Sequence, residues 1–210
     1  MRLTKDTYII SDTHFAHEGV NKFSPERKEL IEQGRNPDKI ILRNWEAISG
    51  EILHLGDFCF KDSTNIAKKI GDFKSMNFLL PGNHDTKADL TYLFGFKKII
   101  KGVQVDLNGR NYILDEFIGP FGNAIIKDFE GVRVFISHFP LFDNCEHDQK
   151  KDFAKSIKAL EELYEDFNCD INIHGHTHGR NSNFKKCIIV CVEKTDFKQF
   201  KFSEILEKYA

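Results

Sequence analysis

The sequence predicts an α/β fold, in which buried strands alternate with helices. Short apolar runs end in Asp, Asn or His, and amphipathic helical patterns separate several of them. In the middle of the chain, Asn108 and Gly109 stand between two apolar stretches, which is a strong signal for a two-residue hairpin. The length of 210 residues suits one domain, so we expect a single domain over residues 1–210.

Five apolar runs have the length of buried strands, and each is followed by polar residues. They cover residues 7–10, 52–55, 76–80, 132–136 and 170–173. A further apolar strand is expected over residues 187–192. The region 98–128 is expected to be antiparallel, with short strands at 103–107, 111–114 and 123–128.

Helical patterns lie between these strands. Apolar residues recur at spacings of three and four from Pro37 to Ser49, and Ser63 is placed to cap a short helix that ends at Gly71. Helices are also expected at 86–94 and, with the clearest amphipathic pattern, at 148–167. Residues 17–36 are expected to be a loop with one short helix near 26–33, and residues 197–210 a strand followed by a helix.

Composition excludes several classes of function. The formal net charge of -2 and the scattered lysines form no basic stripe, so nucleic acid is not supported as a partner. The five cysteines are odd in number and contain no C-x-x-C pair, which argues against a disulfide framework and a structural zinc knuckle. No apolar run approaches the roughly 20 residues of a membrane span, so we expect no membrane partner and a cytoplasmic location. The oligomeric state is left open.

Polar residues after the five apolar runs have the spacing of metal ligands. Asp12 and His14 are two residues apart, as are His176 and His178, and residues two apart in an extended segment point to the same side. An α/β sheet brings its strand ends to one crevice. We therefore expect seven side chains to meet: Asp12, His14, Asp57, Asn83, His138, His176 and His178. Their mixture of oxygen and imidazole donors suits Mn, Fe or Zn, and their number suits two metals that share one carboxylate.

Each of these signals has a plainer interpretation when it is taken alone. The three alternating histidines near residue 176 could be a solvated polar loop, and Pro81-Gly82 could be an ordinary turn beside a surface histidine. His54, inside a strand, is expected to be a core or supporting histidine rather than a ligand. His17 is left open between a residue on the substrate side and an exposed histidine.

In order along the chain, Asp-x-His, Gly-Asp, Gly-Asn-His-Asp, a single His after a strand, and Gly-His-x-His resemble the calcineurin-like metallophosphoesterase superfamily. The resemblance runs from Asp12 to His178. It implies a four-layer double β-sandwich flanked by helices. It also implies that one metal is held by Asp12, His14, Asp57 and His178, and the other by Asp57, Asn83, His138 and His176, with Asp57 as the bridge.

The same resemblance implies a reaction. A hydroxide that bridges the two metals would attack phosphorus in line, and His84 would protonate the leaving group or stabilise the transition state. Asp85 would orient His84. Arg180 could bind a phosphate, although an exposed loop arginine is an equal alternative, and His17 is a second candidate for substrate contact.

The compact chain and its Ser-Asp-Thr-His opening resemble the small bacterial and phage members of the superfamily, which implies a phosphodiesterase acting on a small phosphodiester or nucleotide-like substrate. Manganese is the expected metal, with Fe, Zn, Ni or Co as alternatives. A phosphomonoesterase, such as a nucleotidase or protein phosphatase, remains the main alternative function. A nuclease and a non-catalytic binding scaffold are the other two.

Overall fold

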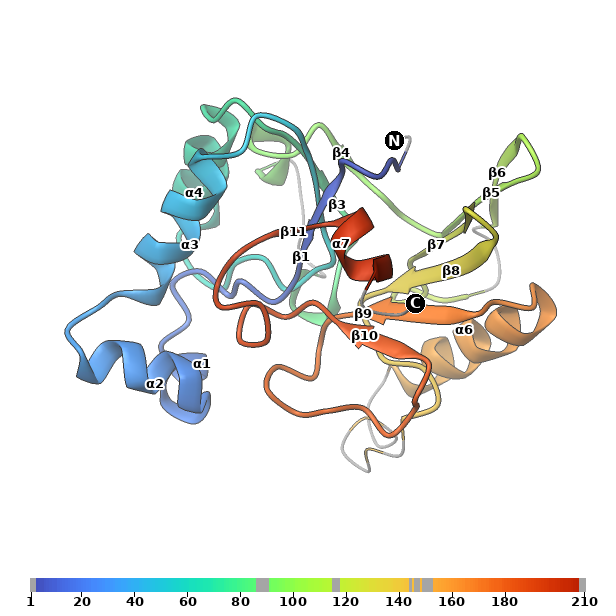
Figure 1. Cartoon of the computed structure of the whole chain (residues 1–210). Helices are drawn as coiled ribbons and strands as arrows, with labels where there is room; N and C mark the ends of the chain where they lie inside the picture. The colour runs from blue at the N-terminus through green and yellow to red at the C-terminus, as the bar shows by residue number, and fades with distance from the viewer. Residues whose placement is uncertain are drawn as a thin grey trace.

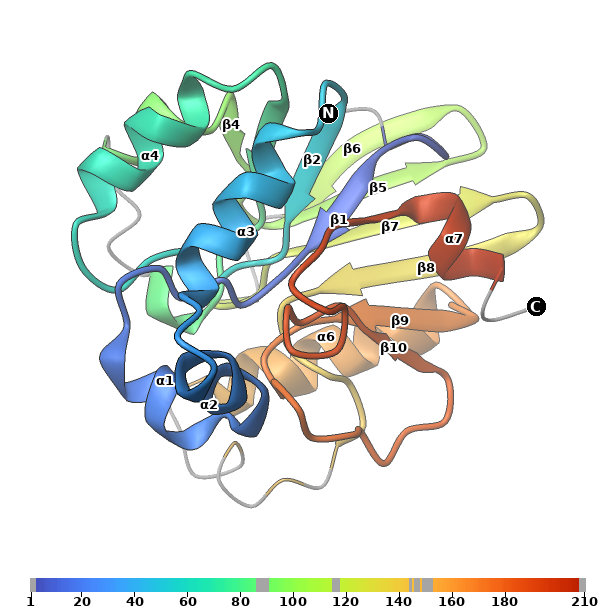
Figure 2. The same ribbon diagram turned by 60° about the vertical axis from the view of Figure 1, so that its left-hand side comes forward.

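Two β-sheets pack face to face, with helices on their outer sides (Figures 1 and 2). The computed structural model describes residues 3–85, 91–114, 118–143, 145, 148 and 153–207. Three buried clusters separate the layers. This arrangement confirms the predicted α/β class, with two sheets sandwiched between helices.

The first sheet has five strands in the order β11-β1-β2-β3-β4. Strands β1 to β4 pair in parallel, and β11 pairs antiparallel to β1 at the edge. The strands are β1 (Tyr8–Ile10), β2 (Glu51–His54), β3 (Met76–Leu79), β4 (Lys98–Ile99) and β11 (Phe200–Lys201). The parallel arrangement brings the carboxyl ends of β1, β2 and β3 to one edge.

The second sheet has six strands in the order β10-β9-β8-β7-β5-β6. Its strands are β5 (Val103–Leu107), β6 (Arg110–Leu114), β7 (Ala124–Phe129), β8 (Val132–Ser137), β9 (Ile171–His174) and β10 (Cys187–Ile189). Asn108 and Gly109 both have positive φ and close the β5–β6 hairpin, as predicted. Parallel pairing of β8 with β9 brings their carboxyl ends to the same edge.

The prediction that region 98–128 is antiparallel holds only for the hairpin. Strand β7 pairs in parallel with the other edge of β5 instead of continuing beside β6, and β4 joins the parallel first sheet.

The helices begin at local signals that the sequence carries. Asn36 accepts a hydrogen bond from the Lys39 amide, and Pro37 occupies the first turn of the next helix. One helix earlier, Ser24 accepts a hydrogen bond from the Arg27 amide, and Pro25 occupies the first turn. The helices are α1 (Glu18–Phe23), α2 (Pro25–Glu32), α3 (Pro37–Glu46), α4 (Ser63–Gly71), α6 (Ala154–Asp166) and α7 (Phe202–Glu207), with 3₁₀ turns η1 (Asn83–Asp85) and η2 (Tyr92–Phe94).

Alternating strand residues fill the two faces of the first sheet. Ile10 and Leu79 face α3 and α4, where Trp45 is fully buried, whereas Ile9 and Leu53 face the second sheet. On the far side of the second sheet, a third cluster packs the sheet against α6 (Figure 2). The molecule therefore has the order helices, sheet, sheet, helix, which is the predicted four-layer arrangement.

Several boundaries differ from the prediction. Residues 17–36 contain two helices, α1 and α2, rather than a loop with one helix, because Ser24-Pro25 starts a new helix instead of only breaking the pattern. The strand predicted to reach residue 192 ends at Ile189, and Cys191 forms an isolated bridge with Ser11 instead. Helix α4 begins after Asp62, so Ser63 is its first residue and not its cap.

Of the helix predicted at 86–94, residues 86–90 lie outside the described residues and Tyr92–Phe94 forms a 3₁₀ turn. The predicted helix at 148–167 is described as α6 from Ala154 onward. The described parts of the chain contain no helix that is long and apolar enough to cross a membrane.

Candidate metal centre

Five loops meet at one edge of the sandwich, each directly after a buried strand. Asp12 and His14 follow β1, Asp57 follows β2, and Asn83 follows β3, all from the first sheet. In the second sheet, His138 follows β8, and His176 and His178 follow β9. The expected convergence of seven side chains is present, and their contacts define two groups.

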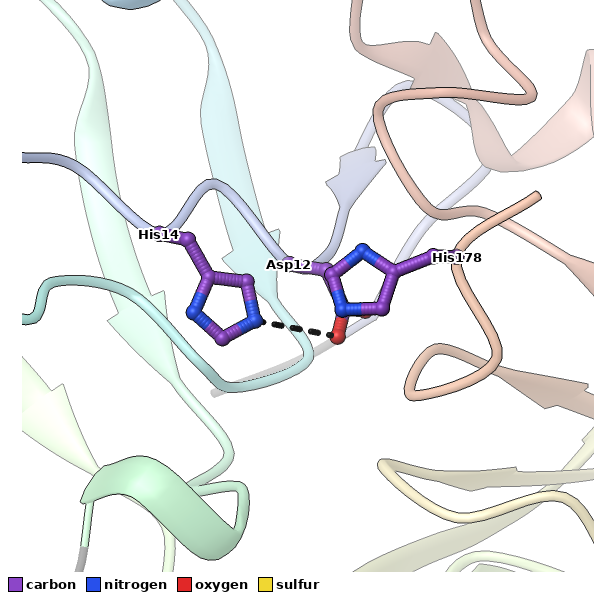
Figure 3. Close-up of side chains that lie close together, drawn as sticks. All are labelled: Asp12, His14 and His178. Carbon is purple, nitrogen blue, oxygen red and sulfur yellow. Dashed lines mark ion pairs between the residues drawn. The ribbon is translucent and has the colours of Figure 1, made fainter. Parts of the chain in front are cut away.

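The first group consists of Asp12, His14 and His178, whose ligand atoms all lie within 4.8 Å of one another. Figure 3 shows the three side chains pointing toward one another, with His14 Nε2 3.9 Å from Asp12 Oδ1. The rings of His14 and His178 are stacked, with their centroids 5.0 Å apart. A carboxylate and two imidazoles at these distances can hold one divalent cation.

The second group consists of Asp57, His138 and His176, whose ligand atoms also lie within 4.8 Å of one another. Asn83 completes it, because its Oδ1 lies 3.0 Å from His138 Nε2 and 3.1 Å from His176 Nδ1. The amide oxygen thus faces the same point as the two imidazoles.

Asp57 lies between the two groups. Its Oδ2 is 3.4 Å from His14 Nε2 and 3.6 Å from His138 Nε2, while its Oδ1 accepts a hydrogen bond of 2.8 Å from the His84 amide. One carboxylate oxygen is therefore close to an imidazole of each group. This is the position that a bridging ligand requires.

Three buried atoms of the first group have no hydrogen-bond partner: Asp12 Oδ1, His14 Nε2 and His178 Nδ1, the last of which lies 3.3 Å from Glu193 Oε1. Asp12 Oδ1 and His14 Nε2 are both inaccessible to solvent and unpaired. A buried polar atom without a partner costs on the order of 1–3 kcal/mol. A divalent cation between Asp12 Oδ1 and His14 Nε2 would satisfy both of them, so the donor set fits a metal.

Five of the seven candidate ligands have a left-handed backbone. The φ angles are 57° at Asp12, 44° at His14, 56° at Asp57, 67° at His176 and 50° at His178. Non-glycine residues adopt this conformation uncommonly, and such residues gather at functional sites. The loops therefore accept backbone strain in order to aim these side chains at one place.

Glycines allow the carboxylates to approach the neighbouring backbone. A Cβ at Gly175 would collide with Asp12 Oδ2 and Ser11 Oγ, and a Cβ at Gly82 would collide with Asp57 Oδ1. The glycines of the Gly-His-x-His and Gly-Asn-His-Asp motifs are thus required by close packing against the two carboxylates.

Burial disfavours the charged forms of Asp57 and His14. Burial, with Asp12 and Asp85 nearby, raises the pKa of Asp57 well above its usual value. Burial also lowers the pKa of His14 well below its usual value. Asp12 differs, because the surrounding histidines and the Ser11 hydroxyl outweigh burial and lower its pKa. A positive charge between Asp12 and Asp57 would favour the ionised form of both carboxylates.

A family model described as calcineurin-like phosphoesterase matches residues 6–180. The chain belongs to the calcineurin-like phosphoesterase family. This confirms the resemblance that the motifs carry, and the match includes all seven candidate ligands. The roles of the individual residues remain predictions.

Solved structures resemble this phosphoesterase to different degrees. A protein of unknown function from Aquifex aeolicus is 24% identical and has a TM-score of 0.66, with 97% of this chain and 98% of that chain covered. An archaeal phosphodiesterase is 19% identical with a TM-score of 0.38, covering 88% of this chain and 81% of its own. A predicted phosphoesterase from Streptococcus pneumoniae is 10% identical with a TM-score of 0.32, covering 88% and 70%. No curated protein matches the chain.

Glu193 and Arg27 support the first group of the phosphoesterase centre. Glu193 Oε1 lies 3.3 Å from His178 Nδ1 and accepts a 2.7 Å hydrogen bond from Arg27 Nε. Arg27 Nη2 also donates to the backbone oxygens of Asp12, at 2.9 Å, and Thr13, at 3.1 Å. One buried ion pair thus contacts both a candidate ligand and the loop that carries another.

The charge of Glu193 acts on His178 as well. Burial lowers the pKa of His178, but the contact with Glu193 outweighs burial and raises it to about 8. The Glu193 carboxylate, 3.3 Å from Nδ1, favours a proton on that ring nitrogen. No local sequence pattern marks Arg27 or Glu193 as parts of the site.

Asp148 contacts His176 of the second group as Glu193 contacts His178 of the first. Its Oδ1 lies 3.1 Å from His176 Nε2, so Nδ1 of the same ring is the nitrogen that faces Asn83. Burial alone would raise the pKa of Asp148, but His176 outweighs it and the pKa is lowered. In the sequence, Asp148 only begins a predicted helix and carries no signal for a role in the site.

The structure corrects the proposed role of Asp85. Its two carboxylate oxygens accept hydrogen bonds from the amides of Asp57, Phe58 and Gly82 and from the Tyr92 hydroxyl. Asp85 therefore holds the loop that carries Asp57, and does not orient the His84 ring. Three backbone donors within reach are a stronger attraction for the carboxylate than one imidazole.

His84 lies beside both groups and is open to solvent. Its Nε2 is 4.0 Å from Asp57 Oδ2, its ring centroid is 5.2 Å from that of His14, and 43% of its side chain is exposed. This is a position from which a bound ester can be reached. Burial and the nearby His138 lower its pKa below the usual value.

The three remaining candidates have distinct surroundings. His54 is fully buried, with Nε2 2.9 Å from Thr13 Oγ1 and Nδ1 accepting from the Gly56 amide at 3.1 Å, as expected for a supporting histidine. His17 Nδ1 lies 3.3 Å from His14 Nδ1. Arg180 forms a bidentate pair with Asp143, at 3.2 and 2.5 Å, so both ends of its guanidinium already face a carboxylate.

Proposed function

We propose that this protein is a metal-dependent phosphodiesterase that uses two divalent cations, with manganese as the preferred metal. The observation that carries the proposal is the pair of His/Asp groups that meet at Asp57. Asp12, His14 and His178 would hold one cation, and Asn83, His138 and His176 the other. Asp57 would contact both.

Two cations held there would supply a water of near-neutral pKa and a positive field for the phosphoryl oxygens. The chain itself supplies position and protons. The His84 backbone amide donates to Asp57 Oδ1, and the partly exposed His84 ring lies 4.0 Å from Asp57 Oδ2, where it could contact an ester oxygen bound at the centre. Its lowered pKa favours a neutral ring at pH 7, which stabilises the leaving oxygen by donating an N–H hydrogen bond.

Charge near the centre favours a diester over a monoester. Among the described residues, Arg27 is buried against Glu193 and Arg180 is paired with Asp143, so both guanidinium groups already have an anionic partner. A diester carries one negative charge at pH 7, whereas a monoester carries almost two. The single charge needs less compensation from side chains. A phosphomonoesterase would use the same two groups and remains the second candidate.

The test compares bis-p-nitrophenyl phosphate with p-nitrophenyl phosphate, each with Mn²⁺, Ni²⁺, Co²⁺, Fe²⁺ or Zn²⁺ added to metal-free protein. We expect faster turnover of the diester, and His84→Ala to lower kcat by about 100-fold while the metal content is unchanged. Asp72→Asn, at an exposed position after α4, serves as the control. No turnover with any of the five metals would contradict the proposal, and faster monoester turnover would favour the second candidate.

A further inference from the structure

Two exposed phenylalanines border the candidate metal centre. Phe60 follows Asp57 in the loop after β2 and is 51% exposed, and Phe23 is the last residue of α1 and is 63% exposed. Each lies beside a histidine of the site. Large apolar side chains in such positions leave ring surface open next to the reacting groups.

Phe60 is held on the side of the centre where His84 lies. Its ring is stacked on that of His17, with centroids 4.1 Å apart and the planes inclined by 17°. The His84 ring centroid is 6.5 Å from that of Phe60, and His17 contacts His14 at 3.3 Å. Stacking on His17 keeps the Phe60 ring in one place, while half of the residue remains accessible.

Phe23 lies near the other end of the first group. Its ring meets His178 edge to face, with the centroids 5.8 Å apart and the planes inclined by 86°. The first group is thus flanked by two exposed aromatic rings. Phe23 lies next to His178, and Phe60 lies next to His17 and His84. A substrate that contacts His84 would lie close to Phe60, and one that extends past His178 would meet Phe23.

We propose that Phe60 and Phe23 bind the planar bases of a small nucleotide diester, such as a dinucleotide, with Phe60 stacking on the base of the leaving nucleoside. This inference rests on the proposed diesterase function and names its substrate class. Every base has a flat π-face that stacks on an aromatic side chain. The net charge of -2 without a basic stripe favours a short diester over a long nucleic acid.

The structure predicts a preference that depends on rings rather than on charge. Removing one stacking side chain weakens nucleic-acid binding by roughly tenfold. We expect Phe60→Ala to raise KM for adenylyl-adenosine by about tenfold, with a smaller rise for Phe23→Ala. The rise in KM should be smaller for glycerophosphoethanolamine, which has no ring to stack.

Two variants at Phe60 separate stacking from apolar contact. Phe60→Trp retains a flat ring and should keep the low KM, whereas Phe60→Leu retains apolar surface without a ring and should behave as Phe60→Ala. Phe94→Ala is the matched control. Phe94 belongs to η2 and is 54% exposed, like Phe60, but its ring contacts Lys68 of α4. Thermal unfolding of each variant checks that the fold is retained.

Binding of adenosine monophosphate, measured by titration calorimetry, gives a readout that does not require turnover. Weaker binding to Phe60→Ala than to Phe94→Ala would support stacking. Equal affinities in wild type and Phe60→Ala, or equal changes with ring-bearing and ring-free diesters, would overturn the inference while leaving the diesterase function standing. A wild-type protein that hydrolyses no diester, yet binds the nucleotide through Phe60, would overturn the function and support the ring contact.

Discussion

The two sheets contribute different chemistry to the centre. The first sheet supplies the oxygen donors, Asp12, Asp57 and Asn83, with one imidazole from His14. The second sheet supplies only imidazoles, from the loops after β8 and β9. Each His/Asp group takes members from both sheets. Neither sheet alone could therefore hold a cation with the full donor set, and metal binding should depend on the packing of one sheet on the other.

The largest effect should come from the one residue that both groups share. Asp57→Asn keeps the shape of the side chain but removes the charge from an oxygen that faces His14 and His138. Removing a residue that only supports a metal ligand typically costs about 10- to 100-fold. We expect Asp57→Asn to cost more, with diester turnover falling by well over 100-fold and the content of both metals falling. Turnover and elemental analysis check this, with Asp72→Asn as the control. A variant that keeps two metals per chain would contradict the bridging position.

The supporting carboxylates allow the two groups to be compared directly. Glu193→Gln changes the contact with His178 and weakens the hold of Arg27 on the Asp12 loop, whereas Asp148→Asn changes the contact with His176. We expect metal affinity to fall by about 10- to 100-fold for Glu193→Gln and by less for Asp148→Asn. Calorimetric titration with Mn²⁺ measures both. Equal losses would show that the Arg27 contact adds nothing.

Metal removal should lower the free energy of unfolding, because the cations are held by residues of both sheets. Cations present at about 100 times their dissociation constant stabilise the folded state by about 3 kcal/mol, which corresponds to roughly 5–10 °C in Tm for a chain of this size. We expect a chelator to lower Tm by that amount, and Asp57→Asn to show a much smaller shift on chelation. An unchanged Tm in the wild type would mean that the sheets do not rely on the metals.

The smallest effect concerns the core of the first sheet. Burial lowers the pKa of His54 to about 3, so between pH 6.5 and that value only the unfolded chain takes up its proton. Stability should therefore fall as the pH falls below 6.5, by about 2 kcal/mol at pH 5 from this residue. Urea unfolding at pH 7 and pH 5 should show a smaller loss for His54→Gln than for the wild type. Equal losses would exclude His54 as the source.

Local patterns in the sequence predicted much of this fold and the members of the site. A polar residue directly after an apolar run is visible in the chain itself, and so are the hairpin at Asn108 and the Asp-x-His and Gly-His-x-His spacings. Because parallel strands bring their ends together, these local signals were enough to predict that Asp12 and His178 would meet.

Contacts between distant segments were not predictable in this way. Arg27 and Glu193 are 166 positions apart, and neither stands in a pattern that marks a buried ion pair. Asp85 is adjacent to His84, which favoured a wrong assignment, because the amides that its carboxylate binds become available only when the β2 and β3 loops pack together. Left-handed φ angles at Asp12 and His176 likewise have no local signal, since sequence patterns assign that conformation to glycine and asparagine.

Two cations should lie at the edge where the two sheets meet, held by donors from both sheets. Crystals of the protein grown with Mn²⁺, measured at the manganese absorption edge, test this directly. We predict two anomalous peaks per chain, one among Asp12, His14 and His178 and the other among Asn83, His138 and His176, with Asp57 touching both. A map with no peak there, or with a single peak bound by residues of one sheet only, would contradict the account.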